Sequence, residues 1–174
     1  MQYVALACRV AIGIVFLVAV LGKLRGRSAF AGFRASVRGL VPVGPRASTA
    51  LSGAIVLAEG CVAVLLAIPG TVRAGMLLAG TVLVGFCAGI VRAMRSGTTT
   101  PCRCFGVTGT PLGGRHLIRN AGLLALVAAG LAPGHLSPQP AGVALSVLAG
   151  AVLAVLVIFF DDLADLFAVQ PRRP

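Results

Sequence analysis

Cys102 and Cys104 are the residues of this chain whose type and spacing are best suited to chemistry. They lie in the polar segment 98–106, and no other two cysteines are close enough in sequence to react together without help from the fold. A disulfide across Cys-x-Cys closes a small strained ring, and strain makes a disulfide easier to reduce. A positive charge near a thiol favours the reactive thiolate, and Arg103 and Arg115 supply such charges. The spacing therefore indicates a redox-active dithiol.

Two other uses of these cysteines are considered. A structural zinc site needs about four ligands, usually in paired Cys-x-x-Cys or His spacings. His116 is the only nearby additional candidate, so the sequence predicts no metal site. A purely structural role for the two thiols stays open, and the redox interpretation is favoured over it.

The composition identifies the environment in which this segment must work. The chain has 174 residues, of which 58% are hydrophobic and 11% charged, and its mean hydropathy is +1.02. These values are typical of an integral membrane protein, and the long continuous apolar runs favour helices over a barrel. The net charge of +11 would indicate nucleic acid in a soluble protein. Here the arginines lie beside apolar runs, where they anchor to anionic headgroups.

We expect one domain, residues 1–174, folded as an all-helical membrane bundle. The apolar runs predict four core transmembrane helices and a fifth, over residues 3–22, 49–68, 74–93, 116–132 and 141–160. The first run lacks a basic start and a cleavage site, so it is predicted to be retained rather than removed as a signal peptide. Between the first two runs, residues 24–47 place apolar side chains at helical spacing among arginines: Phe30, Phe33, Val37, Leu40 and Val41. This pattern predicts a short amphipathic helix in the interface.

Several polar residues lie where a helix exposed only to lipid would not carry them. Glu59 falls inside the second run and is expected to face the bundle interior, to be protonated or to pair with a cation. Arg119 and Asn120 open the fourth run close to the reactive segment, where they are candidates to bind an anion, a quinone carbonyl or a thiolate. His116 beside them either shuttles protons or caps the interface. Lys23, the only lysine, closes the first run.

Other residues in the runs are expected to have structural roles. Arg9 is expected to extend to the interface from the outer end of the first run. Cys61 and Cys87 are expected to be buried, inert thiols, with a resolving role for Cys87 as the less favoured alternative. The sequence assigns no role to Cys8.

The orientation of the chain in the membrane is left open by two opposing arguments. If all five runs cross, the first connection, the Cys-x-Cys connection and the C terminus share one side, which carries most of the basic residues. The positive-inside bias places that side in the cytoplasm. Stable disulfides, however, belong to oxidising compartments outside it.

The motif Pro101-Cys102-Arg103-Cys104-Phe105-Gly106, together with Gly22-Lys23, Glu59 and Arg119-Asn120, resembles the MauE family of methylamine-utilisation proteins within the DoxX-like group. The resemblance implies a four- or five-helix plasma-membrane protein associated with thiol redox. The family's named member is linked to maturation of the disulfide-rich small subunit of methylamine dehydrogenase, alongside a thioredoxin-like partner. By position, Cys102 and Cys104 would be the redox pair. Lys23, Glu59, Arg119 and Asn120 would be the polar residues around it. That role implies an outward-facing site.

Two functions follow as hypotheses. In the first, the protein is a thiol-disulfide or quinone-linked oxidoreductase that passes electrons between a thioredoxin-like partner and a membrane acceptor such as a quinone. Lys23, Arg103 and Arg119 would stabilise the thiolate or the reduced acceptor, Asn120 would contribute to acceptor binding, and Glu59 would relay protons. In the second, the protein is a non-catalytic assembly factor or a subunit of a larger redox complex, and the segment docks a partner. A transporter is less favoured, because no inverted repeat is visible.

Overall fold

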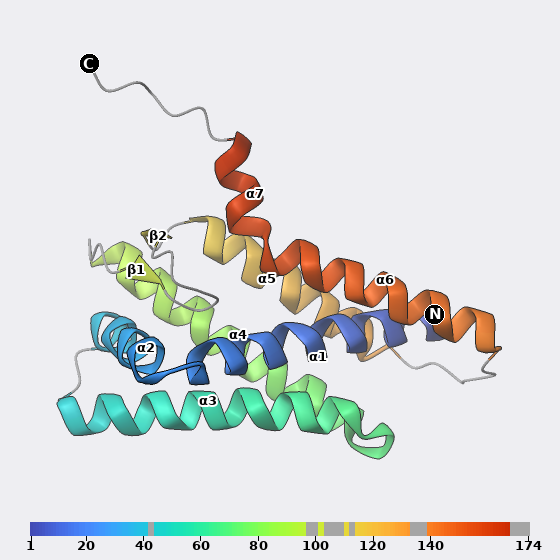
Figure 1. Ribbon diagram of the computed structural model, residues 1–174, viewed down its shortest axis with the longest axis horizontal. Helices are drawn as coiled ribbons and strands as arrows, with labels where there is room; N and C mark the ends of the chain where they lie inside the picture. Colours follow the sequence, from blue (N-terminus) through green and yellow to red (C-terminus); the bar gives the residue numbers. More distant parts are fainter. Residues whose placement is uncertain (42–43, 97–100, 103–109, 112–113, 133–138, 168–174) are drawn as a thin grey trace.

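The computed structural model describes the chain except for residues 42–43, 97–100, 103–109, 112–113, 133–138 and 168–174. At residues 101–102, 110–111 and 165–167 it describes the backbone alone. Long helices run side by side and form the body of the molecule (Figure 1). They are α1 (Gln2–Leu24), α3 (Pro45–Ala67), α4 (Val72–Arg95), α5 (Gly114–Gly130) and α6 (Pro140–Ile158).

Short elements complete the described part of the chain. Helix α2 (Arg27–Leu40) joins α1 to α3, the single 3-10 turn η1 (Pro69–Thr71) joins α3 to α4, and α7 (Phe160–Phe167) follows α6. Strands β1 (Pro101–Cys102) and β2 (Thr110–Pro111) form a two-residue antiparallel ladder inside the connection between α4 and α5. The sequence predicts no strand there. The ladder is too short to change the class, and the prediction of an all-helical membrane bundle is confirmed.

Within the described residues, four helices are long and apolar enough to cross a membrane: Gln2–Leu24, Pro45–Ala67, Pro69–Arg95 and Pro140–Ile158. Helix α5 has 17 residues, so its length of about 25 Å is a little under the roughly 30 Å of a hydrocarbon core. It packs against α1 and α4 within the bundle. The chain is therefore a multi-pass membrane protein.

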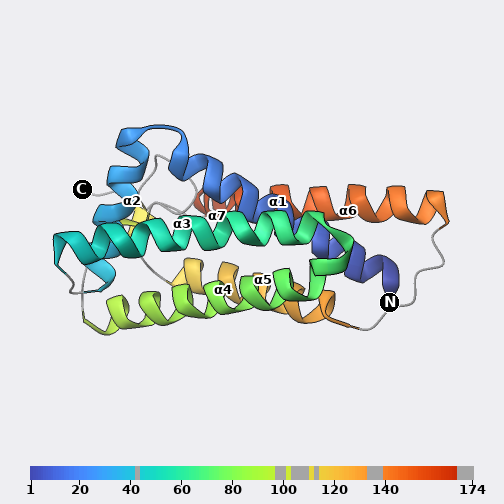
Figure 2. The ribbon, with the colours of Figure 1, turned by 90° about the horizontal axis from the view of Figure 1, so that it is seen from below.

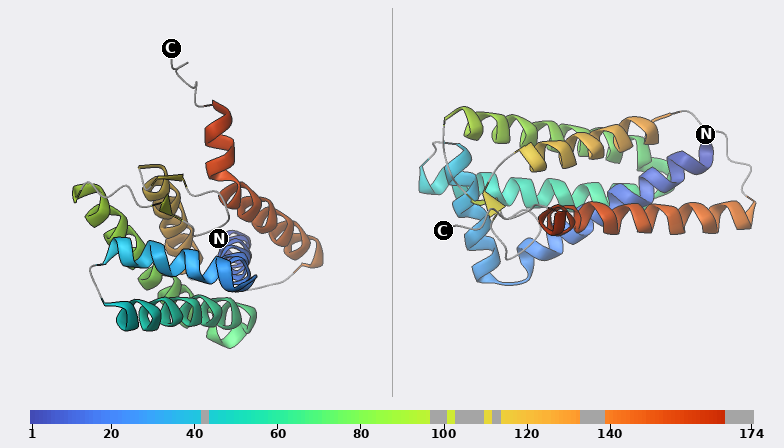
Figure 3. Two further views of the ribbon diagram at one scale, coloured as in Figure 1. Left: turned by 60° about the vertical axis from the view of Figure 1, so that its left-hand side comes forward. Right: turned by 90° about the horizontal axis from the view of Figure 1, so that it is seen from above.

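Most of the polar residues lie at one end of the bundle. Because the helices alternate in direction, α1, α4 and α6 end and α3 and α5 begin toward this end, staggered along the bundle, and α2, β1, β2 and α7 lie on the same side (Figure 2). We call this the polar end. The N-terminus of α1 lies at the other end. Figure 3 shows α2 lying across the bundle at the polar end and α7 turning away from the axis of α6.

Helix α1 occupies the centre of the core. It packs against α3, α5 and α6, and Ile12 is fully buried while Val15 is 2% exposed. Large apolar side chains also cover the outside of the bundle, where Leu57 is 70% and Leu145 68% exposed. Such side chains are at home in lipid, which is as apolar as leucine. Burial in this protein is therefore decided by which face of an apolar helix meets another helix.

Helix α6 approaches α1 closely because one of its faces carries only small residues. Gly142, Ser146, Gly150 and Ala154 follow each other at intervals of four. A Cβ added at Gly150 would lie 2.5 Å from the carbonyl oxygen of Ala7. Small residues at this spacing let two membrane helices pack backbone to backbone.

Helix α2 confirms the predicted amphipathic segment. Phe33 and Val37 are buried against the bundle, whereas Arg34 and Arg38 are exposed. The helix contacts both α1 and α3, so its apolar face is covered by protein. Its basic face points away, as expected of a helix at the membrane surface.

Candidate functional site

A buried ion pair joins the end of α1 to the middle of α3. The Lys23 ammonium donates to both carboxylate oxygens of Glu59, at 2.7 Å each, and each side chain is 2% exposed. Glu59 lies in an apolar helix, where an unpaired carboxylate would cost several kcal/mol. The structure thus shows Glu59 facing the interior and paired with a cation, and the pair ties the end of α1 to the middle of α3.

Aromatic rings from two further helices enclose the Lys23 ammonium. It lies 4.8 Å from the ring centroid of Phe33 in α2 and 6.0 Å from that of Phe86 in α4. Both distances allow a cation–π attraction, which strengthens away from water. The amphipathic helix α2 is therefore anchored through Phe33 to the same charge that binds Glu59.

A second ion pair joins α5 to the start of α7. Arg119 donates to Asp161 at 2.6 Å, and their side chains are 4% and 22% exposed. His116 Nδ1 lies 3.5 Å from the same Asp161 oxygen. Asp161 is given no role by the sequence alone. Its partner lies 42 residues away, so no local pattern could have found the contact.

Asn120 faces α4. Its side chain lies beside the sulfur of Cys87, and Asn120 itself is 5% exposed. Cys87 is only partly buried, so its expected burial is not found, while the expectation that its thiol is inert stays a prediction. The amide beside it distinguishes Cys87 from Cys8, which is buried in the core.

Strands β1 and β2, within the connection that carries the Cys-x-Cys motif, lie at the same end of the molecule. In the ladder, Cys102 pairs with Thr110 and Pro101 with Pro111, and α5 begins at Gly114, shortly after β2. Strand β1 also contacts α2. Cys104 and Arg103 lie outside the described residues, and at Cys102 only the backbone is described.

The candidate residues thus gather at one end but in separate pairs. Lys23 is with Glu59, Arg119 with Asp161, and Asn120 with Cys87. Across the part of the chain that the structure describes, no group of three or more His, Cys, Asp or Glu side chains is arranged to hold a metal ion.

A comparison with protein-family models decides the family. The model described as methylamine utilisation protein MauE matches residues 1–133, which is well over half of the 174-residue chain. The chain belongs to the MauE family. No curated protein and no solved structure matches it.

Helices α6 and α7 of this MauE-family protein follow the matched segment, so Asp161 lies beyond it. Arg119 and His116 lie within it. The partner that neutralises the buried Arg119 is therefore supplied by a part of the chain that the family model does not cover. That partner also explains how a guanidinium can be buried in an apolar bundle.

A further prediction is wrong in this MauE-family chain. Cys61 is exposed rather than buried, because it lies on the outer face of α3, where an apolar thiol meets lipid. Arg9 reaches the end of α3, and its extension to the interface stays a prediction. Its Nε donates to the carbonyl of Leu66 at 2.6 Å and its Nη2 to that of Ala67 at 3.1 Å. The carbonyls at the end of α3 have no partner within the helix, and a cation there also suits the helix dipole.

Proposed function

We propose that this protein is a plasma-membrane thiol-disulfide redox protein that supports disulfide formation in a partner protein. Cys102 and Cys104 form its redox pair, and a thioredoxin-like protein is its immediate partner. Membership of the MauE family is consistent with such an accessory role in a membrane. Methylamine is not part of the proposal, because nothing in these residues recognises an amine.

One observation carries the proposal. Buried polar pairs are concentrated toward the polar end of an otherwise apolar bundle. Strand β1 places the backbone of Cys102 at the same end. Burying Lys23, Glu59, Arg119 and Asn120 costs free energy that apolar residues of similar size would not cost. A stable anchor in lipid does not need these groups, whereas a site that moves electrons and protons does.

The proposed reaction balances within the pair. A thiolate of the reduced partner attacks one sulfur of the Cys102–Cys104 disulfide, which gives a mixed disulfide and one free thiolate. The partner's second thiolate then attacks the mixed disulfide, so the partner leaves oxidised and the pair is left as a dithiol. Two electrons and two protons have then moved to Cys102 and Cys104. Reoxidation passes them to a membrane acceptor of the quinone class.

The surrounding side chains are proposed to act through charge and proton transfer. The guanidinium of Arg103, between the two thiols in sequence, favours the thiolate form. Arg119 supplies hydrogen-bond donors at the start of α5, and its ion pair with Asp161 holds it in place. Glu59 is the proton-relaying group. Lys23 already bonds Glu59 and Asn120 lies beside Cys87, so we propose that they shape the site rather than bind the acceptor's headgroup directly.

Single serine substitutions of the two cysteines test the redox role. We call the protein whose disulfides are formed the client. Cys102→Ser and Cys104→Ser are each expected to reduce disulfide formation in the client to background, because neither variant can close the disulfide. Cys61→Ser is the matched control, since that thiol is exposed on α3, and it should retain activity. All three variants should insert and accumulate normally. The measurement is the redox state of the client in cells, read by thiol alkylation and gel shift.

Normal client oxidation in either loop variant would overturn the redox role. It would favour a non-catalytic assembly factor, in which the segment only docks a partner. In that case charge reversal at Arg115 should abolish partner capture while the serine variants keep it.

A further inference from the structure

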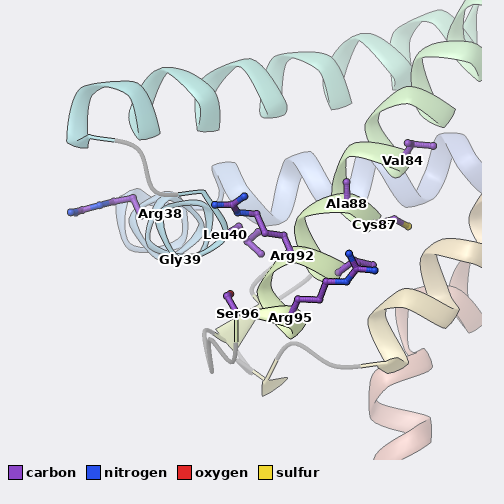
Figure 4. Close-up of a pocket in the computed structure, with 10 residues that line it drawn as sticks. Arg38, Gly39, Leu40, Val84, Cys87, Ala88, Arg92, Arg95 and Ser96 are labelled. Carbon is purple, nitrogen blue, oxygen red and sulfur yellow. The ribbon is translucent and has the colours of Figure 1, made fainter.

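A groove between α2 and α4 at the polar end takes no direct part in the proposed redox reaction, although Cys87, the neighbour of Asn120, is among the residues that line it. It has a volume of about 990 Å³, and its walls include Arg38 and Leu40 of α2 and Val84, Ala88, Arg92 and Arg95 of α4 (Figure 4). Val84, Ala88, Arg92 and Arg95 are all exposed. The groove therefore opens outward, toward the surroundings of the bundle.

Along α4 the groove changes from apolar to basic. Val84, Ala88, Arg92 and Arg95 follow one another at intervals of three or four, which places them on one face of the helix. The rise per residue separates the Cα atoms of Val84 and Arg95 by roughly 16 Å along the axis. The apolar half lies toward the middle of the bundle, where Val84 is 57% exposed, and the basic half lies at the end of the helix. This order matches an amphiphile with its acyl chain in the membrane and its headgroup at the surface.

The basic half attracts an anion. Arg38 comes from the amphipathic helix, which lies at the depth of lipid headgroups, and Figure 4 shows the Arg92 side chain extending from α4 toward α2. No carboxylate is among the residues that line the groove. Within the part of the chain that the structure describes, Arg38, Arg92 and Arg95 form no ion pair. The side chains of Arg38, Arg92 and Arg95 point in different directions (Figure 4). Together they leave the basic half of the groove with positive charge that no lining carboxylate balances, and this charge attracts a phosphate.

We infer that this groove binds an anionic phospholipid. The phosphate lies in the basic half of the groove, which Arg38, Arg92 and Arg95 line, and an acyl chain lies along Val84, Ala88 and Val91. A free phosphate ion would use the basic half and leave the apolar wall unused, whereas a lipid uses both. The inference stands independently of the redox chemistry.

Lipid titration of the purified protein tests the site. The protein is reconstituted in phosphatidylcholine nanodiscs, phosphatidylglycerol is added, and bound lipid is measured by native mass spectrometry. Arg92→Gln/Arg95→Gln should weaken phosphatidylglycerol binding roughly 30-fold, since each basic side chain near a membrane surface contributes roughly fivefold. Arg25→Gln/Arg73→Gln removes the same charge from exposed positions outside the groove and should change binding less than roughly threefold.

A second variant tests the acyl-chain half without changing charge. Val84→Asn places an amide where the chain is expected to lie and should also weaken phosphatidylglycerol binding. Glycerol phosphate, which has no acyl chain, should not displace the lipid at equal concentration.

Four results would overturn the inference. They are equal losses in the two double variants, equal affinity for phosphatidylcholine, no effect of Val84→Asn, and displacement of the lipid by glycerol phosphate. The last would reassign the basic half to a soluble phosphate. Displacement of the lipid by an acidic peptide, from the wild type and from the Arg25→Gln/Arg73→Gln control alike, would likewise overturn the inference and assign the groove to a protein partner.

Discussion

At the scale of single residues, the ion pair of Lys23 and Glu59 is the most constrained feature of the site. Both groups are 2% exposed, so removing either partner leaves a buried charge without compensation. Glu59→Gln or Lys23→Met alone should lower the free energy of unfolding by roughly 3–5 kcal/mol. The double variant Lys23→Met/Glu59→Leu should recover most of that loss, because it buries no charge. Denaturation of the protein in mild detergent measures all three values.

Activity of the same double variant separates a structural pair from a functional one. If Glu59 relays protons, the double variant folds stably and fails to oxidise the client. Full client oxidation by the stable double variant would restrict the pair to holding α1 against α3. If the free energy of unfolding falls in the double variant by the sum of the two single losses, Lys23 and Glu59 do not stabilise each other, and the interpretation of their contact as a compensating ion pair is contradicted.

At the scale of elements, the contact of α1 with α6 depends on the absence of side chains. A Cβ at Gly150 meets the backbone oxygen of Ala7 at 2.5 Å, whereas one at Gly122 in α5 meets nothing within 4 Å. Gly150→Ala should therefore destabilise the bundle by roughly 1–3 kcal/mol, as overpacking does. Gly122→Ala should be neutral or stabilise by up to roughly 1 kcal/mol, because it only restricts the unfolded chain. Thermal unfolding in detergent compares the two, and equal shifts would contradict the close approach.

The packing of α6 also determines how Arg119 is held. Helix α7 begins at Phe160, directly after α6, and its first turn carries Asp161. The small-residue face that seats α6 on α1 therefore also determines where Asp161 meets α5. A shift of α6 caused by Gly150→Ala would consequently reach the ion pair of Arg119.

At the scale of the whole molecule, the distribution of charge opposes the proposed chemistry. Arg9 and Arg73 lie at the end that carries the N-terminus, while most other basic residues of the described chain lie at the polar end. The positive-inside bias would place the polar end in the cytoplasm, but disulfide formation needs it on the oxidising side. Lys23 and Arg119 are buried in ion pairs with Glu59 and Asp161. These two basic residues therefore do not count toward the unpaired positive charge at the polar end.

Labelling of intact cells with a thiol reagent that cannot cross the membrane settles this orientation. The proposed function requires Cys102 and Cys104 to be labelled from outside and only after mild reduction. A single-cysteine variant that retains Cys61, which lies within α3, controls for reagent that reaches thiols inside the membrane. Labelling only after lysis, and without reduction, would place free thiols in the cytoplasm and contradict disulfide formation by this pair.

The sequence by itself determined the class of the molecule and the position of its helices. Long apolar runs can satisfy their backbone groups in lipid only as helices, and the alternation of arginine with Phe33 and Val37 is enough to predict α2. The Cys-x-Cys motif and its neighbours were sufficient to indicate the family. These properties are local, because each depends on residues adjacent in the chain.

Only the tertiary structure decided which polar residues meet and which apolar faces are buried. Lys23 and Glu59 are 36 residues apart, and Arg9 bonds a carbonyl 57 residues away. Cys61 was placed wrongly because a membrane helix is apolar on both its lipid face and its packing face, so hydrophobic periodicity cannot tell one from the other. The close packing of α6 on α1, and with it the place of Asp161 beside Arg119, is set by the shapes of two surfaces that meet only in the folded bundle.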